Sequence, residues 1–123
     1  THTLSNHLLD SRWPKQTEAK NRLTQILKQD RIKADDIFRA MADPARFADE
    51  LLPDTGIGPE FERFLSPLFI KGDQYGTRST TVISVANNGE VSFCEQNHDV
   101  PGRKPDCFTF KIEKGQELVN RAV

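Results

Sequence analysis

A turn signal between two apolar runs constrains this chain more than any other feature of its sequence. Residues 75–95 read YGTRSTTVISVANNGEVSFCE, in which Asn88-Gly89 separates a β-branched run from a second apolar run. Asn-Gly favours a type I′ turn, because that turn needs positive φ at both central residues. The sequence therefore predicts an antiparallel hairpin between residues 80–86 and 90–96.

The same turn predicts the register of the hairpin. If Asn88 and Gly89 are the two loop residues, Ala86 pairs with Val91. The two faces of the hairpin then carry two apolar sets, Val82, Ala86, Val91 and Phe93 on one and Ile83, Val85 and Cys94 on the other. Since both faces are largely apolar, we expect both to be covered, which requires a second sheet as well as helices.

Amphipathic helices precede the hairpin. Apolar residues at helical spacing predict a helix from Pro14 to about Gln29 and a second helix that ends before Pro44. Pro59 begins a last short helix, which ends by Pro67.

Clean alternation over residues 107–113, CFTFKIE, predicts a further strand with Phe108, Phe110 and Ile112 facing inward, and residues 116–123 predict a short terminal helix. With helices over about residues 14–66 and antiparallel strands over about residues 68–113, we expect an α+β fold. Residues 1–123 then form a single domain or half of one.

Charge and composition exclude several classes of function. The 17 Lys and Arg residues nearly balance 18 Asp and Glu residues, so the net charge of −1 draws the chain neither to nucleic acid nor to a membrane surface. The sequence holds no apolar run long enough to span a membrane. His2 and His7 lack a third ligand at a suitable spacing for a metal, and nothing indicates a cofactor.

The two cysteines predict free thiols. Cys94 and Cys107 fall on predicted strands, where a buried thiol behaves as a small apolar group. Two cysteines in a chain of this composition do not indicate a disulfide framework. We therefore expect a reducing compartment, the cytoplasm.

Two polar residues are candidates for ligand contacts. Arg78 precedes a β-branched run, and a guanidinium at the start of a buried strand can bind a carboxylate or phosphate through two hydrogen bonds. Arg78 is equally suited to an ion pair with an acidic residue of its own chain, so both interpretations stay open. Asn6 follows Leu4-Ser5 and is typical of a residue that caps a turn.

Three stretches of the chain resemble the NRDE family, also called the transport and Golgi organisation protein 2 family. They are LSNHLLDSRWPK at residues 4–15, LPDTGI at residues 52–57, and LSPLFIKGDQYGTRSTTVISVANNGEVSFCE at residues 65–95. Their order and spacing are similar to those of the family. Residues after Glu95 carry no part of the resemblance.

The resemblance implies the C-terminal part of a larger fold. Family members are longer, begin with Met-Cys and an Asn-Arg-Asp-Glu motif that this chain lacks, and are related to the N-terminal nucleophile hydrolases. That relation implies an αββα sandwich, of which this chain would supply amphipathic helices followed by an antiparallel sheet. The expected partner is then the chain's own N-terminal half or a second copy of the chain.

The resemblance also implies two functions. The first is an amidohydrolase that acts on C–N bonds, incomplete in this chain because its nucleophile belongs to the missing half. Asn6, Tyr75 and Arg78 would then bind substrate, and no catalytic residue is assigned to this chain. The alternative is a non-catalytic protein that binds or traffics a small molecule, in haem or lipid handling or in Golgi organisation.

Overall fold

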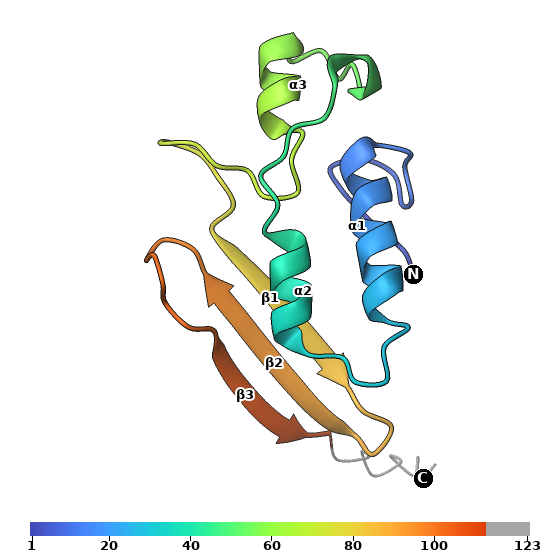
Figure 1. Cartoon of the computed structure of the whole chain (residues 1–123), viewed down its shortest axis with the longest axis vertical. Coiled ribbons are helices and arrows are strands. Elements are labelled where there is room, and N and C mark those ends of the chain that lie inside the picture. Colours follow the sequence, from blue (N-terminus) through green and yellow to red (C-terminus); the bar gives the residue numbers. More distant parts are fainter. Residues whose placement is uncertain (113–123) are drawn as a thin grey trace, which may run out of the picture.

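The computed structural model describes residues 1–112, which form three α-helices and a three-stranded antiparallel sheet (Figure 1). This arrangement confirms the predicted α+β class. The elements in chain order are α1 (Pro14–Ile26), α2 (Ala34–Met41), the 3₁₀ helix η1 (Asp49–Leu51), α3 (Pro59–Leu65), β1 (Ser79–Val85), β2 (Glu90–Asn97) and β3 (Asp106–Lys111). The terminal helix predicted over residues 116–123 lies outside the described residues. Within residues 1–112, no helix combines the length and the apolar character that a membrane crossing requires.

Helix α2 contacts both α1 and β1, so it joins the helices to the sheet (Figure 1). Pro14 opens α1 as predicted, because its missing N–H would have no helical partner in the first turn. Asp35 stands in the first turn of α2, where a carboxylate is favoured by the positive end of the helix dipole. Ile26 of α1 and Phe38 of α2 are each 8% exposed, so the packed interior of the helical layer is small.

Arg22 ties α1 to the end of α2 through polar contacts. Its Nη1 donates to the carbonyl oxygen of Ala40 at 3.0 Å, and its Nη2 pairs with the carboxylate of Asp43. Its Nε donates to Glu18 Oε1 at 2.6 Å. Hydrogen bonds to Glu18 and then to Asp43 raise the pKa of Arg22 above its ordinary value. These bonds hold the C-terminal end of α2 against α1.

The predicted hairpin is confirmed, but the predicted register is wrong by one residue. Strand β1 pairs with β2 so that Val85 lies opposite Val91. The amide of Ala86 donates to the carbonyl oxygen of Glu90 at 2.8 Å, so Ala86 pairs with Glu90 and not with Val91.

The conformation of the loop explains this shift. Gly89 has a φ of 82°, whereas Asn88 does not have a positive φ, which excludes a type I′ turn. The loop therefore contains three residues, 87–89, and ends on a glycine in the left-handed region, the second common solution for a short hairpin. Asn88 Oδ1 accepts the amide of Glu90 at 2.9 Å and so supports this loop.

The shifted register gathers the large apolar side chains of the sheet on one face. That face carries Ile83 and Val85 of β1, Val91 and Phe93 of β2, and Phe108 and Phe110 of β3. Four of them are more than half exposed, Ile83 and Val85 at 62%, Phe108 at 65% and Phe110 at 55%. The expectation that Phe108, Phe110 and Ile112 face an interior was therefore wrong for the described residues, because Ile112 is 54% exposed as well. We call Ile83, Val85, Phe108 and Phe110 the open face.

The opposite face of the sheet carries Val82 and Cys94, and Cys94 is 5% exposed. On the first face, Val91 of the central strand β2 is 3% exposed, whereas the four residues of the open face stand on the outer strands and are not buried. The exposed apolar area of the sheet therefore lies on β1 and β3.

Cys94 and Cys107 are joined by a disulfide, so the expectation of two free thiols was wrong. The two residues lie directly opposite each other on β2 and β3, and their Cα atoms are 4.2 Å apart. This disulfide removes the reason to expect a reducing compartment, because disulfides persist mainly in oxidising environments.

The hairpin loop predicts a matched pair of glycine substitutions. Gly89→Ala should destabilise the chain by more than about 1–2 kcal/mol, because alanine opposes a left-handed φ and its Cβ would lie 3.2 Å from the carbonyl oxygen of Ile112. Gly102→Ala should cost only about 1–2 kcal/mol for the left-handed conformation, since Gly102 has a φ of 76° and no atom lies within 4 Å of the added Cβ. Urea unfolding measures both. Equal losses would contradict the close approach at Gly89.

The open face predicts self-association of the isolated chain. Burying a Val, Ile or Phe side chain contributes about 1.5–3 kcal/mol, against a total stability of about 5–15 kcal/mol. Association that buries the four exposed residues would therefore be strongly favourable. Phe108→Thr should reduce association in light scattering and change the free energy of unfolding little. As a contrast, Phe38→Ala should cost about 3–5 kcal/mol, because Phe38 is buried. A wild-type chain that stays monomeric and binds no apolar dye would contradict this prediction.

Candidate functional site

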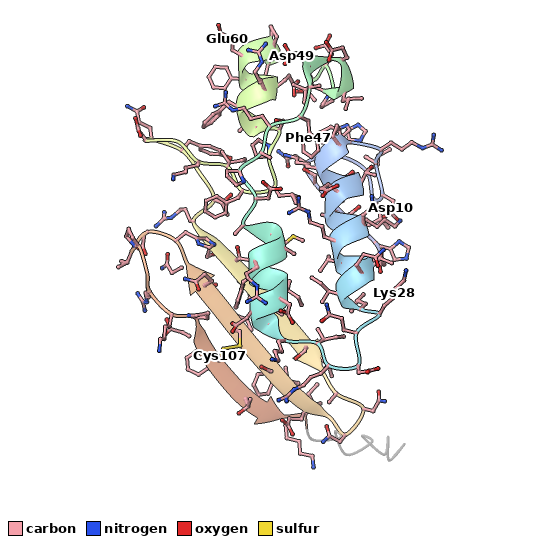
Figure 2. The ribbon with its side chains drawn as sticks, viewed as in Figure 1. Asp10, Lys28, Phe47, Asp49, Glu60 and Cys107 are labelled. Atoms are coloured by element: carbon pink, nitrogen blue, oxygen red, sulfur yellow. A yellow bond between two sulfur atoms is a disulfide. The ribbon has the colours of Figure 1, made fainter. Side chains whose placement is uncertain are left out.

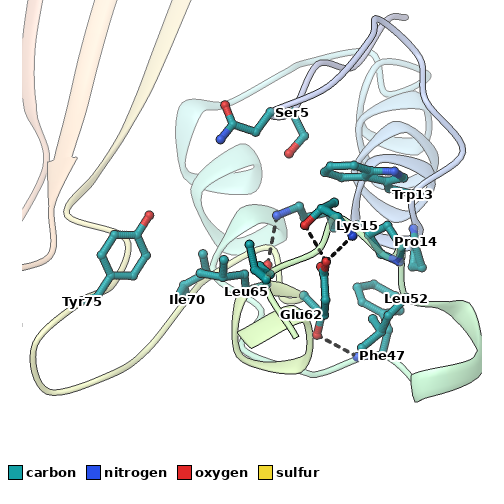
Figure 3. A pocket seen from close by; sticks show the side chains of 15 residues that line it. Ser5, Trp13, Pro14, Lys15, Phe47, Leu52, Glu62, Leu65, Ile70 and Tyr75 are labelled. Carbon is teal, nitrogen blue, oxygen red and sulfur yellow. Dashed lines mark hydrogen bonds between the residues drawn. The ribbon is translucent and has the colours of Figure 1, made fainter. Parts of the chain in front are cut away.

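A cavity of about 510 Å³ lies where the N-terminal loop, the start of α1 and α3 meet (Figure 3). The loop after η1 and the loop before β1 complete its walls. The lining residues are Ser5, Asn6, Trp13, Pro14, Lys15, Phe47, Leu52, Pro53, Thr55, Ile57, Glu62, Leu65, Ser66, Ile70 and Tyr75. A cavity of this volume is in the range that holds a small molecule.

Three segments that are far apart in the sequence supply almost all of this lining. They are the segments that carry the family resemblance, residues 4–15, 52–57 and 65–95. Among the lining residues, only Phe47 and Glu62 lie outside these segments. The cavity is therefore where the three sequence motifs meet in the folded chain, which makes it the strongest candidate for a functional site.

Apolar side chains make up most of the wall, and a few polar groups stand among them. Trp13 and Leu52 are examples of the first kind, and Lys15 and Glu62 are the two charged residues. Binding sites for small molecules have this composition, since apolar walls supply affinity and a few polar groups orient the ligand. Within residues 1–112, no group of three His, Cys, Asp or Glu side chains is arranged to hold a metal ion.

Lys15 is the cation of the cavity. Helix α1 begins at Pro14, so Lys15 stands in its first turn, and its Nζ donates to the carbonyl oxygen of Leu65 at 2.9 Å. Burial lowers the pKa of Lys15 below its ordinary value, and the negative charge of Glu62 opposes this change. No carboxylate among residues 1–112 lies within 4 Å of its Nζ, so the ammonium group keeps donors for a ligand.

Glu62 is the carboxylate of the cavity, and it is buried. It belongs to α3 and is 8% exposed. Its Oε1 accepts the backbone amide of Thr55 at 2.7 Å and the hydroxyl of Thr55 at 2.5 Å. These bonds attach the loop of residues 52–57 to α3. They also offset part of the desolvation cost of burying a carboxylate.

Asn6 and Tyr75, two of the three site residues predicted from the sequence, line the cavity together. Tyr75 is on a loop that is closed by two bonds between Ile70 and Thr77, at 2.9 Å and 3.0 Å. Gly72 allows this loop to lie against α3, because a Cβ at that position would come within 2.8 Å of the ring of Phe64.

Arg78, the third predicted site residue, does not belong to the cavity. It is exposed and is absent from the lining, which corrects the expectation that it borders the same site as Asn6. Its carbonyl oxygen accepts the amide of His98 at 2.8 Å, so its backbone continues the pairing of β1 with β2 by one hydrogen bond. Its guanidinium forms no ion pair among the described residues, so the alternative of an ion pair within the chain is not found there either.

Asp10 supports the loop that carries Asn6. Its Oδ1 accepts the amide of Thr3 at 2.9 Å and Lys20 Nζ at 3.2 Å, and its Oδ2 accepts His2 Nδ1 at 2.6 Å. Hydrogen bonds from His2, then from the Thr3 amide and from Lys20, hold the pKa of Asp10 well below its usual range.

Sequence reasoning missed the two charged residues of the cavity. Lys15 could have been found, because it ends the WPK motif and follows two other residues that line the wall. Glu62 could not have been found from the sequence, because it is one of several acidic residues in its stretch. What distinguishes it is the pair of hydrogen bonds from Thr55, which only the folded chain shows.

Comparison with known proteins agrees with the motifs. A sequence profile described as Transport and Golgi organisation 2 matches residues 1–99. The protein named Transport and Golgi organization 2 homolog from Mus musculus is 28% identical to the chain over 105 residues. This alignment covers 79% of the chain and 38% of the mouse protein, so the chain spans well under half the length of that relative.

The lowered pKa of Asp10 predicts how acid changes stability. The folded-state pKa lies below the unfolded value of about 3.9, so the contribution of Asp10 is present above that value and is lost as the pH falls toward the folded pKa. Urea unfolding should therefore show Asp10→Asn to be less stable than wild type at pH 7, by a difference that shrinks below about pH 4. A difference that stays constant with pH would contradict this role.

Proposed function

Since this chain belongs to the transport and Golgi organisation 2 family, we propose that it binds a small molecule in the cavity between α1 and α3. The observation that carries the proposal is the convergence of three separate motif segments on that one cavity. The geometry best supports a function in which this chain binds a small molecule and does not itself catalyse a reaction on it.

The polar groups of the cavity indicate the chemistry of the ligand. Lys15 donates to Leu65 and has further N–H donors, and Asn6 adds an amide. Both can contact a carboxylate or carbonyl oxygen. Because the remaining wall is largely apolar, the ligand is expected to be an amphiphile with an apolar body and an acidic or carbonyl head.

Amide hydrolysis remains the second candidate function, and the position of Asn6 in the wall favours it. An asparagine amide beside a cavity could stabilise the oxyanion of an acyl-transfer reaction. Thr55 donates its hydroxyl to the buried carboxylate of Glu62, and Ser66 donates to the carbonyl oxygen of Arg63, so each of these hydroxyls is engaged within the chain. For this candidate we propose that the nucleophile belongs to the N-terminal half of a longer protein, as the family resemblance implies.

The open face supports a partner for this unit. Its four exposed residues would be covered either by the N-terminal half of a longer protein or by a second copy of the chain. The mouse relative extends well beyond the aligned part, which is consistent with the first alternative. The cavity is lined by residues of α1, α3 and the loops and by none of the three strands, so a partner on the open face leaves it accessible.

The proposal predicts a saturable ligand signal from Trp13. Trp13 is the only tryptophan of the chain and lines the cavity, so its fluorescence reports on occupancy directly. Titration with dodecanoate should change this fluorescence to saturation. Lys15→Met should weaken binding about tenfold, because a hydrogen bond to a charged group contributes about 1.5–3 kcal/mol and 1.4 kcal/mol is a factor of ten.

Lys28→Met is the matched control. Lys28 is exposed and lies at the end of α1 away from the cavity, so its variant should bind dodecanoate like wild type (Figure 2). Equal affinity for dodecyltrimethylammonium, or no saturable change in Trp13 fluorescence, would contradict the proposal. Release of ammonia from dodecanamide when the N-terminal half of the longer protein is present would favour the hydrolase instead.

A further inference from the structure

Asp10 is a charged residue of the first motif that stands outside the cavity wall. It ends the Leu-Leu-Asp part of residues 4–15, yet it does not line the cavity. We propose that Asp10 is a positioning residue, which holds Ser5 and Asn6 in the wall of the cavity by closing the loop between Thr3 and itself. This inference rests on the proposed binding function.

The bonds between Asp10 and Thr3 close the loop in both directions. The amide of Asp10 donates to the carbonyl oxygen of Thr3 at 2.7 Å, and the amide of Thr3 donates to Asp10 Oδ1 at 2.9 Å. The hydroxyl of Thr3 adds a longer bond to the same oxygen at 3.5 Å. The six residues between Thr3 and Asp10 therefore form a loop whose two ends are hydrogen-bonded to each other.

The backbone of Asp10 is specialised for this role. Its φ of 54° makes it the one residue other than glycine with a positive φ in residues 1–112. This conformation is unfavourable for most side chains, but an aspartate tolerates it where its carboxylate hydrogen-bonds locally. Here the carboxylate bonds to Thr3, so the unusual conformation and the loop closure support each other.

Asp10 also attaches the loop to α1. Lys20 belongs to α1 and donates to Asp10 Oδ1 at 3.2 Å, and Figure 2 shows Asp10 beside that helix. Since the first two residues of α1, Pro14 and Lys15, line the cavity, this contact fixes the loop relative to that part of the wall.

The loop depends on these polar bonds because its apolar side chains are not buried. Leu4, Leu8 and Leu9 are 70%, 73% and 61% exposed. Burial of apolar area, which holds most loops to a protein, therefore contributes little here. The middle of the loop has further contacts, since the ring of His7 lies on the ring of Trp13 with centroids 5.1 Å apart and the hydroxyl of Ser11 donates to the carbonyl oxygen of Leu8 at 2.7 Å.

The test separates the hydrogen-bond acceptor of Asp10 from its charge. Asp10→Ala removes the acceptor for the Thr3 amide, whereas Asp10→Asn can keep it. Binding of dodecanoate, followed by Trp13 fluorescence, should weaken about tenfold in Asp10→Ala and stay within about twofold of wild type in Asp10→Asn. Hydrogen exchange at the Thr3 amide should accelerate in Asp10→Ala alone. Asp99→Ala, on an exposed loop beyond β2, should match wild type in both measurements.

Two results would overturn the inference. One is wild-type affinity in Asp10→Ala, and the other is equal loss of affinity in Asp10→Ala and Asp10→Asn. If wild type fails to bind dodecanoate, the proposed function fails, and the NMR signal of the Asn6 side-chain amide tests the positioning role alone. That signal should shift in Asp10→Ala and not in Asp10→Asn, and an unchanged signal in Asp10→Ala overturns the role.

Discussion

The packing of α2 against both α1 and β1 is the interaction on which the rest of this structure depends. Phe38 is the buried residue of α2, and Arg22 bonds the C-terminal end of α2 to α1. The start of α1 forms one part of the cavity wall, and the loop before β1 carries Tyr75 to another part. The position of α2 therefore sets the relation between two walls of the site without contributing a residue to it.

The cavity and the open face lie on different elements of the molecule. The cavity forms among α1, α3 and the loops, and the open face lies on β1 and β3. The open face is not buried within residues 1–112, although each of its side chains would contribute to stability if buried. Ligand binding and association with further protein can thus occur on separate surfaces.

Polar contacts position several segments of the cavity wall. Thr55 holds one wall loop to Glu62, and Thr3 holds another to Asp10, while Lys15 bonds to the end of α3 at Leu65. These bonds join segments that come from different motifs or from outside them. A hydrogen bond that must be satisfied on burial selects one geometry more narrowly than apolar contact, which is non-directional.

The sequence by itself determined the α+β class, the order of helices before a hairpin, the family motifs, and Asn6 and Tyr75 as candidates, because these follow from local periodicity, turn chemistry and motif order. Only the tertiary structure decided the register, the Cys94–Cys107 disulfide and the exclusion of Arg78 from the site. Asn-Gly permits two loop geometries that differ by one residue, and one residue moves every side chain of a strand to the other face. The disulfide and the set of residues that line the cavity likewise depend on which distant segments the fold brings together. A local sequence pattern carries no information on the distance between such segments.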